Sequence, residues 1–293
     1  MDSPAVAHAE TAAAGTLVLI GGACTRDGHA IGAFLKAARA RGGPIVGITE
    51  ASADPRGSAR LWRDDFAAAG TDGASFIDVV RGDDRLDREN AARIADAGAV
   101  FLGGGDQVKL VASLSGTKTC QAMKTLYHEG GVVCGTSAGA AALSALTLAG
   151  GEVDEEGNLV EQYIGPGFGL LGYEAIIDTH FSQRRRLQRL FLVIADNRQL
   201  FGIGLDENTA LVVRGHVGEV FGAGGVTFVD GRDSVRYDNA ADVEKGRHLT
   251  LSALRVGIVG TNHRLDLRER ELEHLVYGTA TPALRGAGRA VAS

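Results

Sequence analysis

Cysteine is scarce in this chain of 293 residues, which contains three: Cys24, Cys120 and Cys134. Three widely spaced cysteines supply neither a disulfide framework nor the close pair of a metal site. The chain also has no H-E-x-x-H or C-x-x-C motif, so we expect no metal. So few cysteines favour a reducing compartment, and we expect the protein to be cytoplasmic.

Long apolar runs are absent as well, since no stretch reaches the roughly 18 apolar residues that a membrane span needs. Residues 1–14 lack both the basic start and the continuous apolar core of a secretory signal, and we interpret them as a flexible tail. Acidic residues outnumber basic ones by 36 to 30, which gives a net charge of −6. We therefore expect neither a membrane nor a nucleic acid as partner.

Through residue 150, short apolar runs alternate with helical patterns. Strands are predicted at 16–20, 44–49, 75–80, 99–102 and 131–134. Helices are predicted at 30–41, 58–69, 87–97 with Asp87 as the N-cap, 108–114, 118–128 and 137–146. Apolar strands separated by helices are typical of a mostly parallel sheet with helices on both faces, in an α/β fold.

The pattern changes after residue 150. A polar loop is expected at 152–161, a strand at 174–178 and a helix at 183–196. Short strands with glycine turns follow at 201–205, 209–213, 218–221, 226–229 and 249–259. No linker-like change of composition separates the two parts, so we expect one domain over residues 15–293 with a C-terminal antiparallel β extension.

A G-x-S-x-G motif spans Gly135–Gly139 and directly follows the strand predicted at 131–134. A nucleophile elbow needs this strand–turn–helix setting, because the sharp turn lifts the Ser137 oxygen above the sheet edge. The alternative is a serine that caps an ordinary helix. The Gly103–Gly105 run ends another strand and frees backbone N–H groups to bind an oxyanion, or it is simply a flexible turn. We expect the N–H groups near Gly105 and Ala138 to form the oxyanion hole.

His180 stands at the end of an apolar strand and Asp206 and Glu207 at the end of the next, so Ser137, His180 and a carboxylate follow in chain order. His180 would take the serine proton and the carboxylate would hold the imidazole. Spacing alone leaves Asp206 and Glu207 open, and both also suit an ordinary turn. In the predicted helix 183–196, Leu187, Leu190, Phe191 and Ile194 form the apolar face, with Arg185 and Arg189 opposite it and Arg184 and Arg186 flanking it. This arginine run is either a ligand site or a solvated face.

Four segments in this order resemble the cyanophycinases, a group of serine peptidases that also contains dipeptidase E. The matching pieces are G-G-G-D-Q at 103–107, G-T-S-A-G-A at 135–140, D-x-H-F-x-x-R-x-R-x-x-R at 178–189 and G-I-G-L-D-E-N at 202–208. The similarity covers about residues 15 to 270. It implies a flavodoxin-like or class I amidotransferase-like α/β fold and a homodimer.

The resemblance also implies a Ser137–His180–Glu207 triad and hydrolysis of cyanophycin, a poly-aspartate that carries arginine on its side chains. The expected protein is an exopeptidase that releases β-aspartyl-arginine dipeptides. The matching substrate-binding positions are Gln107, Asp178, Arg184, Arg186 and Arg189. Thr179 departs from the glutamine usual in the family, which bears on the substrate. The alternatives are a dipeptidase E-like enzyme for aspartyl or isoaspartyl peptides and a catalytically idle binding homologue.

Overall fold

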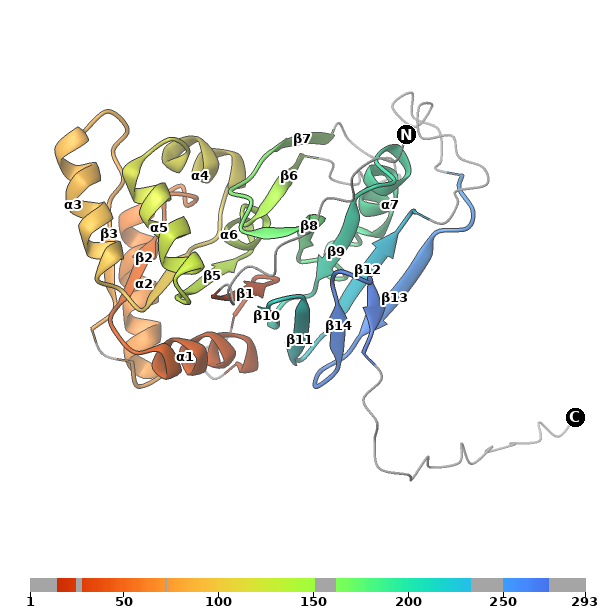
Figure 1. Ribbon diagram of the computed structural model, residues 1–293, viewed down its shortest axis with the longest axis horizontal. Coiled ribbons are helices and arrows are strands. Elements are labelled where there is room, and N and C mark those ends of the chain that lie inside the picture. The colour runs from red at the N-terminus through yellow and green to blue at the C-terminus, as the bar shows by residue number, and fades with distance from the viewer. Residues whose placement is uncertain (1–14, 25–27, 72, 151–161, 233–249, 274–293) are drawn as a thin grey trace, which may run out of the picture.

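Two twisted sheets lie side by side in the computed structural model, which describes residues 15–24, 28–71, 73–150, 162–232 and 250–273 (Figure 1). The nine-stranded sheet has the order β15-β14-β11-β10-β1-β5-β4-β2-β3. The six-stranded sheet has the order β13-β12-β9-β8-β6-β7. The predicted tail at 1–14 and the predicted polar loop at 152–161 lie outside the described residues.

The nine-stranded sheet has a parallel half and an antiparallel half. The parallel strands are β1 (Thr16–Ile20), β2 (Ile45–Ile48), β3 (Ser75–Ile77), β4 (Ala99–Leu102) and β5 (Val132–Thr136). The antiparallel strands are β10 (Thr209–Arg214), β11 (Val217–Gly222), β14 (Arg264–Asp266) and β15 (Glu271–Leu272). β1 is the junction, because it pairs in parallel with β5 and antiparallel with β10.

The six-stranded sheet contains a smaller parallel group of β6 (Ser144–Gly150), β8 (Leu171–Thr179) and β9 (Phe201–Leu205). Antiparallel strands flank this group: β7 (Gln162–Pro166), β12 (Val226–Asp230) and β13 (Arg255–Val259). The core joins the two sheets, since Leu17 and Val133 of the first belong to one apolar cluster with Ile177 and Ile203 of the second.

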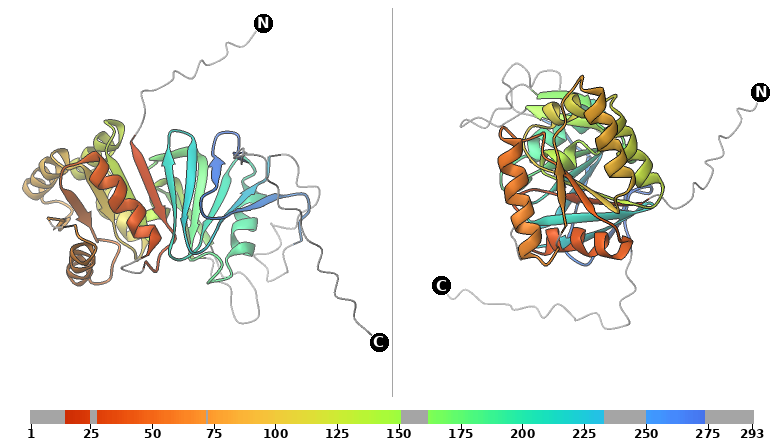
Figure 2. Two further views of the ribbon diagram at one scale, coloured as in Figure 1. Left: turned by 90° about the horizontal axis from the view of Figure 1, so that it is seen from below. Right: turned by 90° about the vertical axis from the view of Figure 1, so that its left-hand side faces the viewer.

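Helices cover both faces of the parallel half (Figure 2). One face carries α1 (His29–Arg41) and α2 (Pro55–Ala68), and the other carries α3 (Asp84–Ala95), α4 (Gln107–Leu114) and α5 (Lys118–His128). A short helix, α6 (Ala138–Ala141), follows β5, and α7 (Leu187–Asp196) packs against the six-stranded sheet. The predicted α/β class, with a mostly parallel sheet and a C-terminal antiparallel extension, is thereby confirmed.

Local chemistry explains where several helices begin. Asp54 caps α2 through the N–H of Gly57, and Pro55 follows at the first helical position, where its missing N–H costs nothing. The strand β1 reads apolar from end to end, and its last four residues are buried because helices cover both faces of the sheet.

Three local predictions were wrong. Residues 137–146 do not form one helix, because α6 ends at Ala141 and β6 begins at Ser144. The helix predicted at 183–196 begins at Leu187 instead, after a turn in which Arg185 has a φ of 53°. Asp87 does not cap α3, since Asp83 does; Asp87 accepts the N–H groups of Lys118 and Thr119 at the start of α5.

Candidate active site

The carboxyl ends of strands from both sheets lie close together. Ser137 follows β5, His180 follows β8 and Glu207 lies two residues after β9. The Gly103–Gly105 run follows β4, the strand beside β5. In parallel α/β sheets, ligands bind outside these strand ends, so the topology places the predicted site residues where a ligand is expected.

Ser137 occupies the strained backbone conformation of a nucleophile elbow, with φ 52° and ψ −117°. The two glycines of its motif are required by close packing. A Cβ on Gly135 would lie 2.3 Å from the carbonyl oxygen of Gly139, and one on Gly139 would lie 2.4 Å from that of Leu102. The motif therefore presses α6 against the ends of β4 and β5 and turns the Ser137 hydroxyl away from the sheet.

Ser137, His180 and Glu207 form a continuous hydrogen-bonded chain. The Ser137 Oγ lies 2.8 Å from His180 Nε2, and His180 Nδ1 lies 2.6 Å from Glu207 Oε1. With the ring proton on Nδ1 donated to the carboxylate, Nε2 is free to accept the serine hydroxyl. The imidazole is 12% exposed and the glutamate side chain 34%.

Asp206, the other candidate for the triad carboxylate, does not bind His180 and accepts hydrogen bonds from two backbone N–H groups instead. Its Oδ1 accepts the N–H of Ser182 and its Oδ2 accepts the N–H of Gly225, each at 3.0 Å. Asp206 therefore ties the turn after His180 to the turn before β12, while the neighbouring Glu207 holds the imidazole.

Backbone N–H groups near Ser137 are available for an oxyanion. Among the described residues, no backbone carbonyl accepts the N–H of Gly105 or of Ala138. Gly104 also closely approaches the serine, since a Cβ placed on it would lie 3.3 Å from Ser137 Cβ. Gly105 itself has a φ of 138° and packs against the Ala51 carbonyl, a conformation that requires glycine.

A cavity of about 380 Å³ opens beside Ser137 and His180. Every substrate-binding and oxyanion residue predicted from the sequence lines it: Gly105, Gln107, Ala138, Asp178, Thr179, Arg184, Arg186 and Arg189. Three guanidinium groups and two carboxylates, those of Asp106 and Asp178, line the cavity, which leaves its wall with a positive balance of one charge that suits an anionic ligand.

Two of the predicted arginines bind the buried Asp178 carboxylate, and the third is exposed. Arg189 is 4% exposed and makes two bonds to Asp178, which is 2% exposed. Arg186 Nη1 also reaches Asp178 Oδ1, at 3.2 Å, and the carbonyl of Thr179 at 2.8 Å. Arg184 is exposed, and no hydrogen bond or ion pair joins its side chain to another described residue.

Three expectations about Asp178 and the helix that follows it need correction. Arg189 was expected opposite the apolar face of its helix, yet it is buried beside Leu190, because the helix turns that side toward Asp178. Asp178 was expected among the substrate-binding positions, but its carboxylate already binds Arg186 and Arg189. Leu187, predicted in the apolar face, is 41% exposed because it begins the helix.

Gln107 and Thr179 both line the cavity, but Gln107 is half-buried and Thr179 is buried. The Gln107 amide donates to the carbonyl of Leu148, which leaves its side-chain oxygen for other partners. Thr179 is 5% exposed, and its own N–H donates to Asp178 Oδ1. The short threonine side chain therefore lies deep beside the buried carboxylate.

The cysteines are poor alternative nucleophiles. Burial raises the pKa of the Cys24 thiol, and burial raises that of Cys134 well above its usual value. Both thiols thus stay protonated near neutral pH, and the thiolate is the reactive form.

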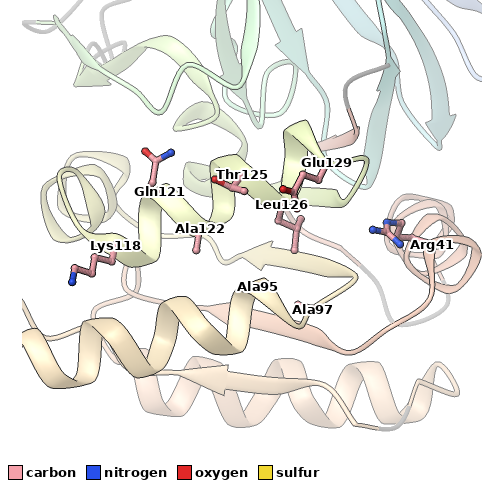
Figure 3. Close-up of a pocket in the computed structure, with 9 residues that line it drawn as sticks. All are labelled: Arg41, Ala95, Ala97, Lys118, Gln121, Ala122, Thr125, Leu126 and Glu129. Atoms are coloured by element: carbon pink, nitrogen blue, oxygen red, sulfur yellow. The ribbon is translucent and has the colours of Figure 1, made fainter. Parts of the chain in front are cut away.

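A second hollow of about 340 Å³ lies beside α5, near the amino end of β4 and not at the carboxyl ends of the strands (Figure 3). Its nine lining residues include no serine, cysteine or histidine: Arg41, Ala95, Ala97, Lys118, Gln121, Ala122, Thr125, Leu126 and Glu129. This hollow therefore lacks a serine–histidine pair such as the one at the cavity beside Ser137.

Gly22 was not predicted as functional, although it contacts the site. Gly22 packs directly against the His180 ring, with the position of an added Cβ 2.4 Å from Nε2. The only sequence signal was the glycine pair that follows the first strand.

The fold and this residue set define a class of α/β peptidases, and comparisons with known proteins agree. The model of peptidase family S51 matches residues 62–220. The chain is 32% identical over 274 residues to a cyanophycinase of Synechococcus elongatus, covering 91% of this chain and 84% of that protein. A cyanophycinase of Geminocystis herdmanii is 31% identical over 232 residues, 78% of this chain and 84% of that protein.

A solved structure shows the same fold. The crystal structure of a peptidase from an acI-B1 actinobacterium has a TM-score of 0.58 and 21% identity, covering 76% of this chain and 93% of that one. The chain is a peptidase and belongs to peptidase family S51. Among the described residues, no helix combines the length and apolar composition that a membrane span requires.

Proposed function

We propose that this protein is a serine exopeptidase that hydrolyses cyanophycin and releases β-aspartyl-arginine dipeptides. The observation that carries the proposal is the Ser137–His180–Glu207 chain, set in a cavity whose wall holds three arginines. The similarity to cyanophycinases over 91% of the chain supports the substrate class.

In the proposed mechanism, Ser137 Oγ attacks the scissile backbone carbonyl while His180 Nε2 takes the hydroxyl proton. Glu207 stabilises the imidazolium that forms. N–H groups of Gly105 and Ala138 hold the oxyanion. The C–N bond then breaks as His180 gives its proton to the leaving amine. A water molecule, deprotonated by His180, hydrolyses the acyl-enzyme ester and regenerates Ser137.

Substrate selection is assigned to Arg184, with support from the buried cluster. Its exposed guanidinium can donate two parallel hydrogen bonds to a substrate carboxylate. Arg186 and Arg189 add positive charge, but their N–H groups donate hydrogen bonds to Asp178, so we propose that these two arginines stabilise the cavity wall. Gln107 and Thr179 complete the wall beside the substrate.

The wider proposal concerns the whole protein. Residues 15–293 form one peptidase domain, which acts in the cytoplasm as a homodimer. It requires no metal or cofactor and binds neither nucleic acid nor a membrane. The scarcity of cysteine and the acidic net charge support the compartment and the absence of polyanion binding.

The experiment compares substrates with purified protein. We expect cyanophycin to be cut to β-aspartyl-arginine, identified by mass, with a kcat/KM well above that for plain isoaspartyl dipeptides. Ser137→Ala serves as the control for contaminating peptidases. Preference for the plain dipeptides would instead favour the dipeptidase E-like alternative, and no turnover of either would favour an idle homologue.

A further inference from the structure

Three successive carbonyl groups at the end of β1 bind three different segments of the site. The oxygen of Ile20 accepts the N–H of Ser137 at 2.9 Å, that of Gly21 accepts the N–H of His180 at 2.8 Å, and that of Gly22 accepts the N–H of Asn208 at 2.8 Å. Asn208 directly follows Glu207. One short turn of backbone therefore contacts the segment of each triad member.

The three residues held in this way share a positive φ angle, which is unusual for residues other than glycine. The φ angles of Ser137, His180 and Asn208 are 52°, 50° and 48°, in the left-handed region that favours glycine. Residues in such conformations persist only where their surroundings hold them. The carbonyl groups after β1 supply one fixed hydrogen bond to each.

Gly22 adds a steric contact to these hydrogen bonds. A Cβ at this position would lie 2.4 Å from both Cε1 and Nε2 of the His180 ring. Both ring nitrogens already take part in hydrogen bonds, Nε2 with Ser137 and Nδ1 with Glu207, so the ring cannot shift without breaking them. A methyl group on Gly22 would therefore push the imidazole out of its position between the other two residues.

We propose that the turn formed by Ile20, Gly21 and Gly22 is the positioning segment of the triad, and that Gly22 fixes the place of the His180 imidazole. Gly22 is a positioning residue, because it touches the general base and not the substrate. The inference rests on the proposed triad, though not on cyanophycin as the substrate.

The first test measures how fast a fluorophosphonate reacts with Ser137, since this reaction reports on serine activation without a substrate pocket. The Oγ–P bond forms, the P–F bond breaks, fluoride leaves and His180 takes the hydroxyl proton. We expect Gly22→Ala to slow the reaction roughly 10²-fold, the size of effect that a small misplacement of a catalytic group produces.

Gly130→Ala is the matched control. Gly130 has a φ of 90° against 99° for Gly22, but nothing lies within 4 Å of its added Cβ. Both variants put alanine in a strained backbone, and only one meets the imidazole. Gly130→Ala should label within about twofold of wild type, because its strain lies far from the triad. Labelling of Gly22→Ala at the wild-type rate would overturn the inference.

A double-mutant cycle tests the same contact without any reaction. Gly22→Ala should lower the melting temperature more in the wild type than in the His180→Ala background. In that background, the decrease in melting temperature should equal the decrease that Gly130→Ala causes. Equal losses in both backgrounds would refute the steric contact. If Gly22→Ala alone fails to fold, recovery of folding in the double variant supports the inference, and failure of the double variant contradicts it. If wild type does not label at all, the proposed nucleophile fails, and the cycle still decides the role of Gly22.

Discussion

Glu207→Gln is the substitution that most sharply separates the two carboxylates at the end of β9. It keeps the size of the side chain and removes the charge that faces His180 Nδ1 at 2.6 Å. A neutral amide can present its NH₂ group to Nδ1 and hold the wrong imidazole tautomer, in which Nε2 carries the proton and cannot accept one from Ser137.

The expected loss is large. Removing the orienting carboxylate of a triad lowers kcat on the order of 10³- to 10⁴-fold, or about 4–5.5 kcal/mol of transition-state stabilisation. The lower end applies if water replaces part of the lost interaction, because the Glu207 side chain is 34% exposed. Asp206→Asn is the matched control, since its two bonds go to Ser182 and Gly225 and neither touches His180.

The assay is steady-state hydrolysis of cyanophycin by both variants, with melting temperatures measured in parallel. Asp206→Asn should stay within about tenfold of wild type in kcat and should lose about 1–3 kcal/mol of stability, because one amide oxygen cannot replace two carboxylate oxygens. A larger loss of kcat in Asp206→Asn than in Glu207→Gln would transfer the orienting role to Asp206 and refute this reasoning.

The remaining predictions concern specificity and the groups that the reaction does not use. Arg184→Lys should lower kcat/KM on cyanophycin by one to two decades, about 1.5–3 kcal/mol, and should change kcat/KM little on a substrate without the aspartyl carboxylate. If the substitution leaves kcat/KM unchanged on both substrates, Arg184 is only a solvated side chain. Thr179→Gln, which restores the residue usual in the family, should raise cyanophycin activity, and a fall would mean that the buried site has no room for it. Prolonged treatment with a chelator should leave activity unchanged, whereas loss that zinc restores would contradict a serine mechanism. Burial raises the pKa of Cys24, so iodoacetamide should react slowly at pH 7 and faster as pH rises; rapid inactivation at neutral pH would indicate an activated thiol.

The parallel half of the fold could be predicted because each of its strands is a short apolar run that ends in glycine or a polar turn. β1 and β4 coincide with the predicted 16–20 and 99–102. The elements after Ser137 could not be predicted as well. Residues 144–150 suit a helix or a strand, and pairing with β8 decides for the strand β6.

Most of the candidate site could be predicted from the sequence, but the partners of individual charged side chains could not. Motifs at strand ends identified all three residues of the hydrogen-bonded chain, because parallel strands end at one edge. They also identified the polar side chains predicted to bind substrate, but not apolar lining residues such as Leu148 and Ile177. Helical periodicity misplaced Arg189, since a buried ion pair with Asp178 outweighs the preference of a charge for solvent. Spacing could not separate Asp206 from Glu207, because their partners lie far away in the sequence: backbone N–H groups of Ser182 and Gly225 for Asp206, and the His180 ring for Glu207.

The most direct test of the central claim compares wild type with Ser137→Ala in cyanophycin hydrolysis, with products identified by mass. The account predicts β-aspartyl-arginine from wild type and a loss on the order of 10⁴- to 10⁶-fold in the variant, with an unchanged fold by circular dichroism. Turnover by Ser137→Ala above about a tenth of the wild-type rate, far outside the range for a lost nucleophile, would contradict it.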